Sequence, residues 1–117
     1  MKPRSNQELC IHYLKEYAKK NLQSMDELFA ENIVLRDWKI YVAGKEKALA
    51  ETQKNFESAQ SIEIEVLNTY ENQETVAAEL KITVDSTEIL YVVDVITFNQ
   101  KGQIQSIRAY LGRGDED

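Results

Sequence analysis

Residues 89–98 constrain the fold more than any other part of the sequence, because these ten positions are rich in β-branched and aromatic side chains. A polar connection that ends in Gly102 follows this run, and a second β-rich run continues to Leu111. Two such runs around a short connection that contains glycine predict a β-hairpin. The chain is therefore expected to be organised around two neighbouring, antiparallel strands of a sheet.

Asp94 is the only charged residue between positions 90 and 98. Side chains alternate between the two faces of a strand, so Asp94 shares its face with apolar neighbours such as Val92 and Ile96. A carboxylate in that position loses hydration that apolar side chains cannot replace. We therefore expect Asp94 to be ion-paired, hydrogen-bonded, or held protonated with a raised pKa.

The register of the hairpin decides which residue lies opposite Asp94. If the connection is a plain four-residue loop, Phe98 pairs with Gln103 and Asp94 lies opposite Ile107. One bulged residue would bring Arg108 opposite instead and would allow a structural ion pair. The sequence leaves the functional and the structural interpretation of Asp94 open.

The rest of the chain divides into a helical half and a strand half. The predicted elements of the first half are helices at residues 5–20, 21–29 and 45–58 and short strands at residues 33–38 and 40–43. From residue 61 onward apolar and polar residues alternate, which predicts a four-stranded antiparallel meander over residues 61–111. Three helices followed by a meander predict an α+β fold with the helices on one face of a curved sheet.

Two of the predicted helices have recognisable first residues. Ser5, with Glu8 three positions later, predicts a capping box at the start of the first helix. Asn21 can cap the second helix through its side-chain oxygen. The two helices would then form a helical hairpin.

Composition excludes several classes of protein. The 117-residue chain is 43% hydrophobic and 29% charged, which is typical of one soluble globular domain. We expect a single domain over residues 1–112 and a disordered acidic tail over residues 113–117. A net charge of −6 argues against a nucleic-acid-binding protein and against contact with an anionic membrane.

The reactive side chains and the N-terminal segment argue against further kinds of site and further classes of protein. Cys10 is the only cysteine and His12 the only histidine, so the sequence indicates no internal disulfide and no metal site. The glycines form no phosphate-binding loop. No apolar run resembles a secretion signal or a membrane span, so we expect a cytoplasmic protein.

Two further residues are candidates for chemistry, each with a structural alternative. Asp37 lies near the end of a predicted strand, where an aspartate commonly bonds its own backbone in a turn. Tyr13 lies on the buried face of the first helix, where an aromatic core residue is the commoner case. Tyr17 and Tyr110 have an equal claim by composition alone.

The order of these elements, together with two sequence segments, resembles the nuclear transport factor 2 superfamily, and in particular its ketosteroid isomerase and SnoaL-like branch. The segments are LFAENIVLRD and VVDVITFNQKGQIQSIRAY, and the likeness covers residues 5–112. The resemblance implies a cone-shaped, cystatin-like α+β fold. In such a fold a curved antiparallel sheet packs on three helices and surrounds an apolar pocket.

In ketosteroid isomerases a tyrosine of the first helix and two aspartates form the site, and these positions fall on Tyr13, Asp37 and Asp94. The resemblance implies a cofactor-independent isomerase or cyclase that moves a proton α to the carbonyl of a small hydrophobic ketone. Asp37 would act as general base, while Tyr13 and a neutral Asp94 would donate hydrogen bonds to the enolate oxygen. The expected pocket-lining residues are Trp38, Phe56, Leu80, Val92 and Ile96.

A homodimer through the outer face of the sheet is the expected assembly. The resemblance implies it, and outward-facing apolar side chains such as Tyr91 and Val93 support it, because an exposed apolar sheet face usually has a partner. The expected ligand is a small hydrophobic molecule, with no cofactor, nucleic acid or membrane as partner.

A second hypothesis is a non-catalytic module of the same fold that binds a small ligand or forms dimers. Catalysis requires Tyr13 and Asp94 to point toward one place in an open cavity, with Asp37 across it. An ion pair between Asp94 and Arg108, or a cavity filled by aromatic side chains such as Trp38, would favour the second hypothesis. A protein-transport adaptor is a third class, for which the sequence offers no sign of a peptide groove.

Overall fold

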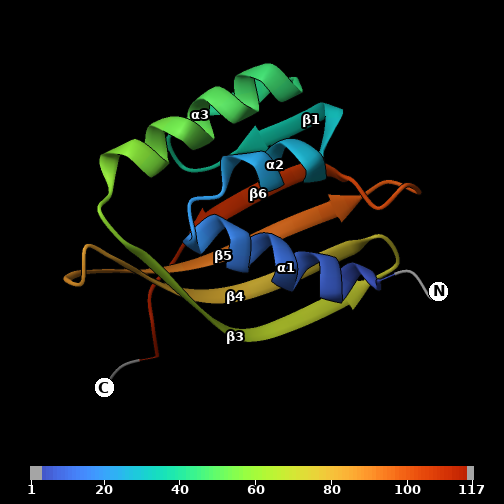
Figure 1. Ribbon diagram of the computed structural model, residues 1–117. Helices are drawn as coiled ribbons and strands as arrows, with labels where there is room; N and C mark the ends of the chain where they lie inside the picture. The colour runs from blue at the N-terminus through green and yellow to red at the C-terminus, as the bar shows by residue number, and fades with distance from the viewer. Residues whose placement is uncertain (1–3, 116–117) are drawn as a thin grey trace.

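The computed structural model describes residues 4–115 and has three helices on one face of a curved, unclosed sheet (Figure 1). The helices are α1 (Asn6–Ala18), α2 (Leu22–Leu28) and α3 (Lys45–Ser58). The strands are β1 (Phe29–Arg36), β2 (Tyr41–Ala43), β3 (Ile62–Asn72), β4 (Thr75–Val84), β5 (Glu88–Phe98) and β6 (Ile104–Leu111). The predicted α+β class is confirmed.

The sheet has the strand order β2-β1-β6-β5-β4-β3. The predicted meander is confirmed, because β3, β4, β5 and β6 pair in sequence and each pair is antiparallel. Strand β1 joins the far edge of this meander by pairing in parallel with β6 and antiparallel with β2. As Figure 1 shows, the helices lie on one side of the sheet, so no helix of the described part of the chain covers its other side.

Both predicted helix caps are present. The hydroxyl of Ser5 accepts a hydrogen bond from the Glu8 N–H at 3.1 Å, and the Glu8 carboxylate accepts one from the Ser5 N–H at 2.8 Å. The side chain of Asn21 accepts a hydrogen bond from the Ser24 N–H at 3.2 Å. Helix α1 ends at Ala18, two residues earlier than predicted, and Lys20 has a φ of 58° that no helix continues through.

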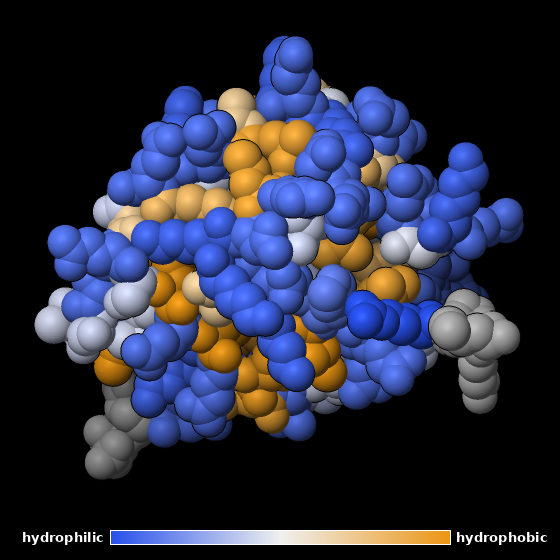
Figure 2. Space-filling view, viewed as in Figure 1, coloured by the Kyte–Doolittle hydropathy of each residue, from blue (hydrophilic) through white to orange (hydrophobic). Residues whose placement is uncertain are grey.

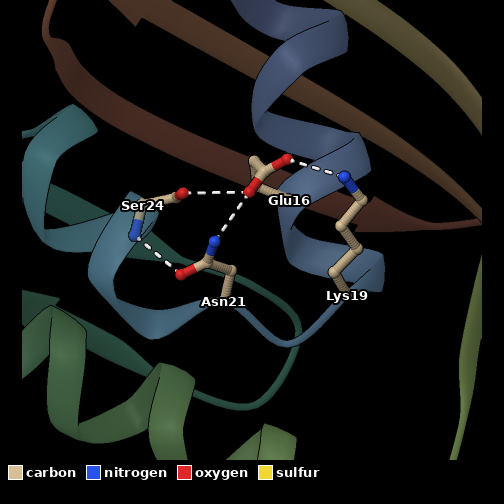
Figure 3. Close-up of polar contacts among 4 residues, drawn as sticks. All are labelled: Glu16, Lys19, Asn21 and Ser24. Atoms are coloured by element: carbon tan, nitrogen blue, oxygen red, sulfur yellow. Dashed lines mark hydrogen bonds and ion pairs between the residues drawn. The ribbon is translucent and has the colours of Figure 1, made fainter.

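A polar network fixes the corner between α1 and α2 (Figure 3). One oxygen of Glu16 accepts hydrogen bonds from the Asn21 amide at 2.8 Å and from the Ser24 hydroxyl at 3.0 Å. The other oxygen accepts one from the Lys19 ammonium at 3.3 Å. The hydrogen bond from Ser24, followed by those from Asn21 and Lys19, lowers the pKa of Glu16. The network therefore holds the end of α1 against the start of α2.

Strand β1 begins at Phe29, four residues earlier than predicted, and directly follows α2. The Phe29 N–H still donates to the Met25 carbonyl, while the Phe29 backbone is already extended with φ −76° and ψ 132°. The ring of Phe29 is 1% exposed, and its backbone pairs with Ile104 of β6. The transition needs no connecting turn, so the sequence carries no turn signal that would mark it.

The register of the β5–β6 hairpin differs from both predicted alternatives. The Asn99 N–H donates to the Gln103 carbonyl at 2.9 Å, so Gln103 belongs to the turn and Phe98 pairs with Ile104. A bulge follows directly, between the Phe98 and Thr97 pairs. Together these two shifts place Asp94 opposite Ala109, not Ile107 or Arg108.

The core lies between the helices and the inner face of the sheet. Its largest fully buried side chains are Phe29, Phe98, Met25, Ile33, Leu80, Ile96, Ile104, Val76 and Cys10. The helical side of the molecule is mostly hydrophilic at its surface, with smaller hydrophobic areas between the polar side chains (Figure 2). No helix within residues 4–115 is long and apolar enough to cross a membrane.

Residues 112–115 follow β6 without regular secondary structure. The Gly112 N–H donates to the Tyr91 carbonyl at 2.7 Å, so the chain stays beside β5 where it leaves the sheet. Of the predicted acidic tail, residues 116–117 lie outside the described residues, and so do residues 1–3 at the other end. The expected disorder of the tail stays a prediction.

Candidate active site

A cavity of about 310 Å³ lies between α1, α3, the loop after β1 and the inner face of the sheet. Its wall is mainly apolar, with the side chains of Leu35, Ile62, Ile64, Leu80, Ile82 and Ile107. The cavity opens to solvent beside five lining residues that are exposed, namely Trp38, Lys39, Asn55, Ser58 and Glu88. A volume of this size suits a small organic molecule.

The cavity brings together the three residues that the sequence singled out for chemistry. Tyr13 reaches it from α1, Asp37 from the loop after β1, and Asp94 from β5. Residues that lie between 24 and 81 positions apart in the chain therefore face one space, as 37 − 13 = 24 and 94 − 13 = 81.

The expected lining residues divide into two groups. Trp38 and Leu80 line the cavity. Phe56, Val92 and Ile96 do not, although all three are buried. Phe56 packs edge to face on the Tyr17 ring at a centroid distance of 4.9 Å, so Tyr17 occupies the wall in its place.

Asp94 is 8% exposed, and its two neighbours in the sheet are alanines, Ala78 on β4 and Ala109 on β6. An alanine side chain offers no hydrogen bond, and none of the described residues forms a hydrogen bond or an ion pair with the Asp94 carboxyl. Burial first, and then the negative charge of Asp37, raise the pKa of Asp94 to about 7. A large fraction of Asp94 is therefore protonated near neutral pH and can donate a hydrogen bond.

Arg108 does not form an ion pair with the Asp94 carboxyl. It pairs with Val95, the residue after Asp94, so its side chain projects from the opposite face of the sheet. The structural alternative of an Asp94–Arg108 ion pair is therefore wrong.

Tyr13 is 5% exposed, and its ring contacts the rings of Tyr17 and Phe29 at centroid distances of 5.9 and 6.5 Å. Within residues 4–115, the hydroxyl makes no hydrogen bond. Burial first, and then the nearby Asp94, raise the pKa of Tyr13 well above its usual value. The phenol therefore stays protonated, and its O–H is available to an oxygen atom in the cavity.

Asp37 performs the structural role that the sequence offered as its alternative. One of its carboxylate oxygens accepts the backbone N–H groups of Lys39 at 2.7 Å and Ile40 at 2.9 Å, which ends β1 in a turn. Of the residues that the structure describes, none donates a hydrogen bond to the second oxygen. The turn thus holds the side chain in one orientation at the cavity wall and leaves one oxygen for another use.

Sequence reasoning did not find Asn55, which lines the cavity from α3. Its amide nitrogen donates a hydrogen bond to the Tyr17 hydroxyl at 3.2 Å. Helical spacing could have pointed to this pair. Asn55 lies three residues after the buried Thr52 on one predicted helix, and Tyr17 lies one turn after Tyr13 on another.

The arrangement provides two kinds of chemical group around one apolar space. Tyr13 and protonated Asp94 are neutral donors without an acceptor among residues 4–115, suited to an oxygen that gains negative charge. Asp37 carries a fixed carboxylate oxygen without a donor, suited to accept a proton.

Comparisons with known proteins agree with this architecture. The sequence profile of the SnoaL-like domain family matches residues 11–107. No sequence among curated proteins matches the chain.

Three solved structures show the likeness in three dimensions. The epoxide hydrolase/cyclase-like enzyme SalBIII, which has a role in pyran ring formation in salinomycin, has a TM-score of 0.80 at 21% identity, over 92% of this chain and 90% of its own. A protein of Kribbella flavida provisionally named a ketosteroid isomerase scores 0.80 at 15% identity, over 96% and 81%. A provisionally named SnoaL-like polyketide cyclase of Shewanella denitrificans scores 0.80 at 12% identity, over 92% and 90%. At these identities the likeness shows the fold.

Proposed function

The chain belongs to the SnoaL-like domain family, and we propose that it catalyses cofactor-independent proton transfer at the carbon α to the carbonyl of a small hydrophobic ketone, as an isomerase or a related cyclase. One observation carries the proposal. Tyr13, Asp37 and Asp94 face a single apolar cavity, and the Asp94 carboxyl lacks any partner among residues 4–115. The names of the SalBIII, ketosteroid isomerase and cyclase structures support an isomerase or a cyclase.

Asp37 is the general base in this proposal. Its second carboxylate oxygen accepts the α proton, while the electron pair of the broken C–H bond moves to the carbonyl oxygen and forms an enolate. The backbone hydrogen bonds from Lys39 and Ile40 keep the accepting oxygen oriented during the transfer. When the ketone carries a β,γ double bond, the enolate extends to the γ carbon, and Asp37 returns the proton there, which completes an isomerisation without a cofactor.

Tyr13 and Asp94 stabilise the enolate. Tyr13 is protonated, and Asp94 is protonated below its pKa of about 7. Both are buried, and neither donates to another described residue, so their O–H groups remain available to the carbonyl oxygen. In an apolar cavity such donors are worth more than in water, because fewer water molecules compete for the charged oxygen. Two alanines flank Asp94, and one of them, Ala109, lines the cavity beside it.

The test is exchange of the α proton with solvent deuterium on a panel of cyclic enones, followed by nuclear magnetic resonance. We expect wild-type protein to exchange at least one member of the panel. Asp37→Asn should lower that rate by a factor of about 10² or more, because it removes the base and keeps the size of the side chain. Circular dichroism would verify that the variant is folded, and equal rates in both proteins would remove Asp37 from the mechanism.

The alternative function is a non-catalytic module that binds a small apolar ligand. Two features that would have favoured it are not found, because Arg108 projects away from Asp94 and Trp38 is 43% exposed at the mouth of the cavity. Ligand binding by wild-type protein without proton exchange on any enone of the panel would favour this alternative.

A further inference from the structure

The oxygen of the Tyr17 hydroxyl accepts a hydrogen bond, but its proton is not donated to any described residue. Asn55 donates its amide hydrogen to the phenol oxygen at 3.2 Å, so the phenol proton must point elsewhere. No described residue accepts that proton. Because both side chains line the cavity, the proton is available to an oxygen atom of a bound molecule.

The Tyr17 ring is held in place by its neighbours. It packs edge to face against Phe56 at 4.9 Å and against Tyr13 at 5.9 Å, measured between ring centroids. Tyr13 and Tyr17 lie one helical turn apart on α1, so their hydroxyls are presented by the same face of the helix. The cavity therefore has a second phenol beside the one assigned to the enolate.

The other hydroxyls of α3 that line the cavity are already committed. The Thr52 hydroxyl donates to the Ala48 backbone carbonyl at 2.8 Å, and the Ser58 hydroxyl donates to the Asn55 backbone carbonyl at 3.0 Å. The side chain of Asn55 differs, because it uses one amide hydrogen for Tyr17 and keeps a second amide hydrogen and its side-chain oxygen. The pair of Tyr17 and Asn55 is thus the part of this wall with hydrogen-bonding capacity left over.

We propose that Tyr17 binds a second oxygen of the substrate and that Asn55 positions the Tyr17 hydroxyl for this contact. The preferred substrate is then a ketone with another hydrogen-bond-accepting oxygen. Tyr17 and Asn55 distinguish this substrate from a ketone of the same carbon frame that lacks the second oxygen. This proposal rests on the proposed function, in which Tyr13 and Asp94 bind the first oxygen of the substrate, its carbonyl oxygen.

The electrostatic surroundings agree with a neutral donor at this position. Burial raises the pKa of Tyr17, the hydrogen bond from Asn55 opposes this effect, and the charges of Asp94 and Asp37 raise the pKa further. Tyr17 therefore keeps its proton and lies within electrostatic range of both carboxyl groups. A neutral acceptor oxygen suits this place better than an anion, which the carboxylates would repel.

The test measures binding, so it does not depend on turnover. The probes are 2-naphthol, which has one oxygen, and its monomethoxy derivatives, which add an acceptor oxygen at different places on the same frame. Affinities are measured by fluorescence titration below the Asp94 pKa of about 7. At least one methoxy derivative should bind wild-type protein more tightly than 2-naphthol does.

Tyr17→Phe keeps the ring and removes the hydroxyl. It should weaken binding of the favoured methoxy derivative about three- to tenfold, the value of one neutral hydrogen bond, and leave 2-naphthol unchanged. Asn55→Asp should have the same selective effect, because a carboxylate would accept the Tyr17 proton and withdraw it from the ligand. Tyr13→Phe is the matched control and should weaken both probes.

Equal loss for both probes in Tyr17→Phe would assign the residue to packing and overturn the proposal. Wild-type protein that does not prefer any methoxy derivative, or that binds none of the probes, would overturn it as well. Failure of the proposed function has a different signature, because the absence of α-proton exchange leaves these binding differences intact.

Discussion

Asp94 pairs with Ala109 across the β5–β6 ladder, so a methyl group lies where the sequence allowed a guanidinium. The guanidinium belongs to the residue before Ala109 on β6. Arg108 projects from the outer face, and its charge cannot hold Asp94 ionised from within the cavity. The raised pKa of Asp94, and with it the proposed donor role, therefore depend on a register set by the turn and a single bulge.

A cation placed at residue 109 should strongly reduce activity. Ala109→Lys would put an ammonium beside Asp94, favour its ionised form and remove a donor from the enolate, which should lower kcat about 10²-fold or more. Ala109→Met fills similar space without charge and separates the electrostatic effect from blockage of the cavity. Arg108→Ala, on the outer face, should change kcat less than about twofold. The measurement is α-proton exchange, and equal rates in the lysine and methionine variants would contradict the role of charge.

The pH dependence of activity should reveal a protonated Asp94. Because the pKa of Asp94 is about 7, kcat/KM should fall as the pH rises above this value and the donor loses its proton. Asp94→Asn keeps a neutral donor of the same shape that does not titrate in this range. The alkaline fall in kcat/KM should therefore disappear in that variant. A fall at the same pH in both proteins would assign it to another group.

Asp94 should also make the folded state less stable as the pH rises. Its pKa is raised in the folded protein to about 7 from a reference value of 3.8, so between these values the native state keeps a proton that the unfolded state has released. The free energy of unfolding should therefore decrease from about pH 4 to pH 7 on account of this group. The loss is on the order of 4 kcal/mol and is complete above the folded pKa.

Asp94→Asn is the variant that tests this contribution to stability. Urea unfolding at pH values across the window should show a smaller decrease in the variant than in wild-type protein, and the variant should be the more stable of the two at the alkaline end. Parallel curves for the two proteins would show that Asp94 titrates alike in the folded and unfolded states.

We propose that the uncovered outer face of the sheet forms a homodimer. On β5 this face presents Ile89, which is 50% exposed, and the partly exposed Tyr91, Val93 and Val95. Val93→Lys should convert a dimer to a monomer, because it places a charge in the middle of an apolar contact, while its neighbour Glu79 on β4 tolerates the charge in the monomer. Ala50→Lys, on the exposed surface of α3, is the control.

Sedimentation velocity would distinguish these states directly. A monomeric wild-type protein, or an unchanged dimer in Val93→Lys, would contradict an interface on this face. Dissociation by both lysine variants would indicate a general effect of charge and would contradict it too.

Local sequence signals predicted most of the secondary structure. The capping box of Ser5 and Glu8 and the cap at Asn21 act within four residues, so their chemistry is complete in the local sequence. Helix α3 occupies residues 45–58 as predicted, since its apolar spacing and the preceding Gly44 are also local. The start of β1 was not predictable in this way. Phe29 becomes part of the sheet by pairing with Ile104, which lies 75 positions later in the chain, as 104 − 29 = 75.

The sequence by itself determined that one carboxyl would be held on the apolar face of a strand, because alternation along β5 follows from backbone geometry alone. Only the tertiary structure decided what that carboxyl faces. Its alanine neighbours depend on a strand register that one bulged residue changes, and the approach of Tyr13, Asp37 and Asn55 depends on how separate elements pack. Such placements result from contacts between distant parts of the chain, which no local pattern of residues records.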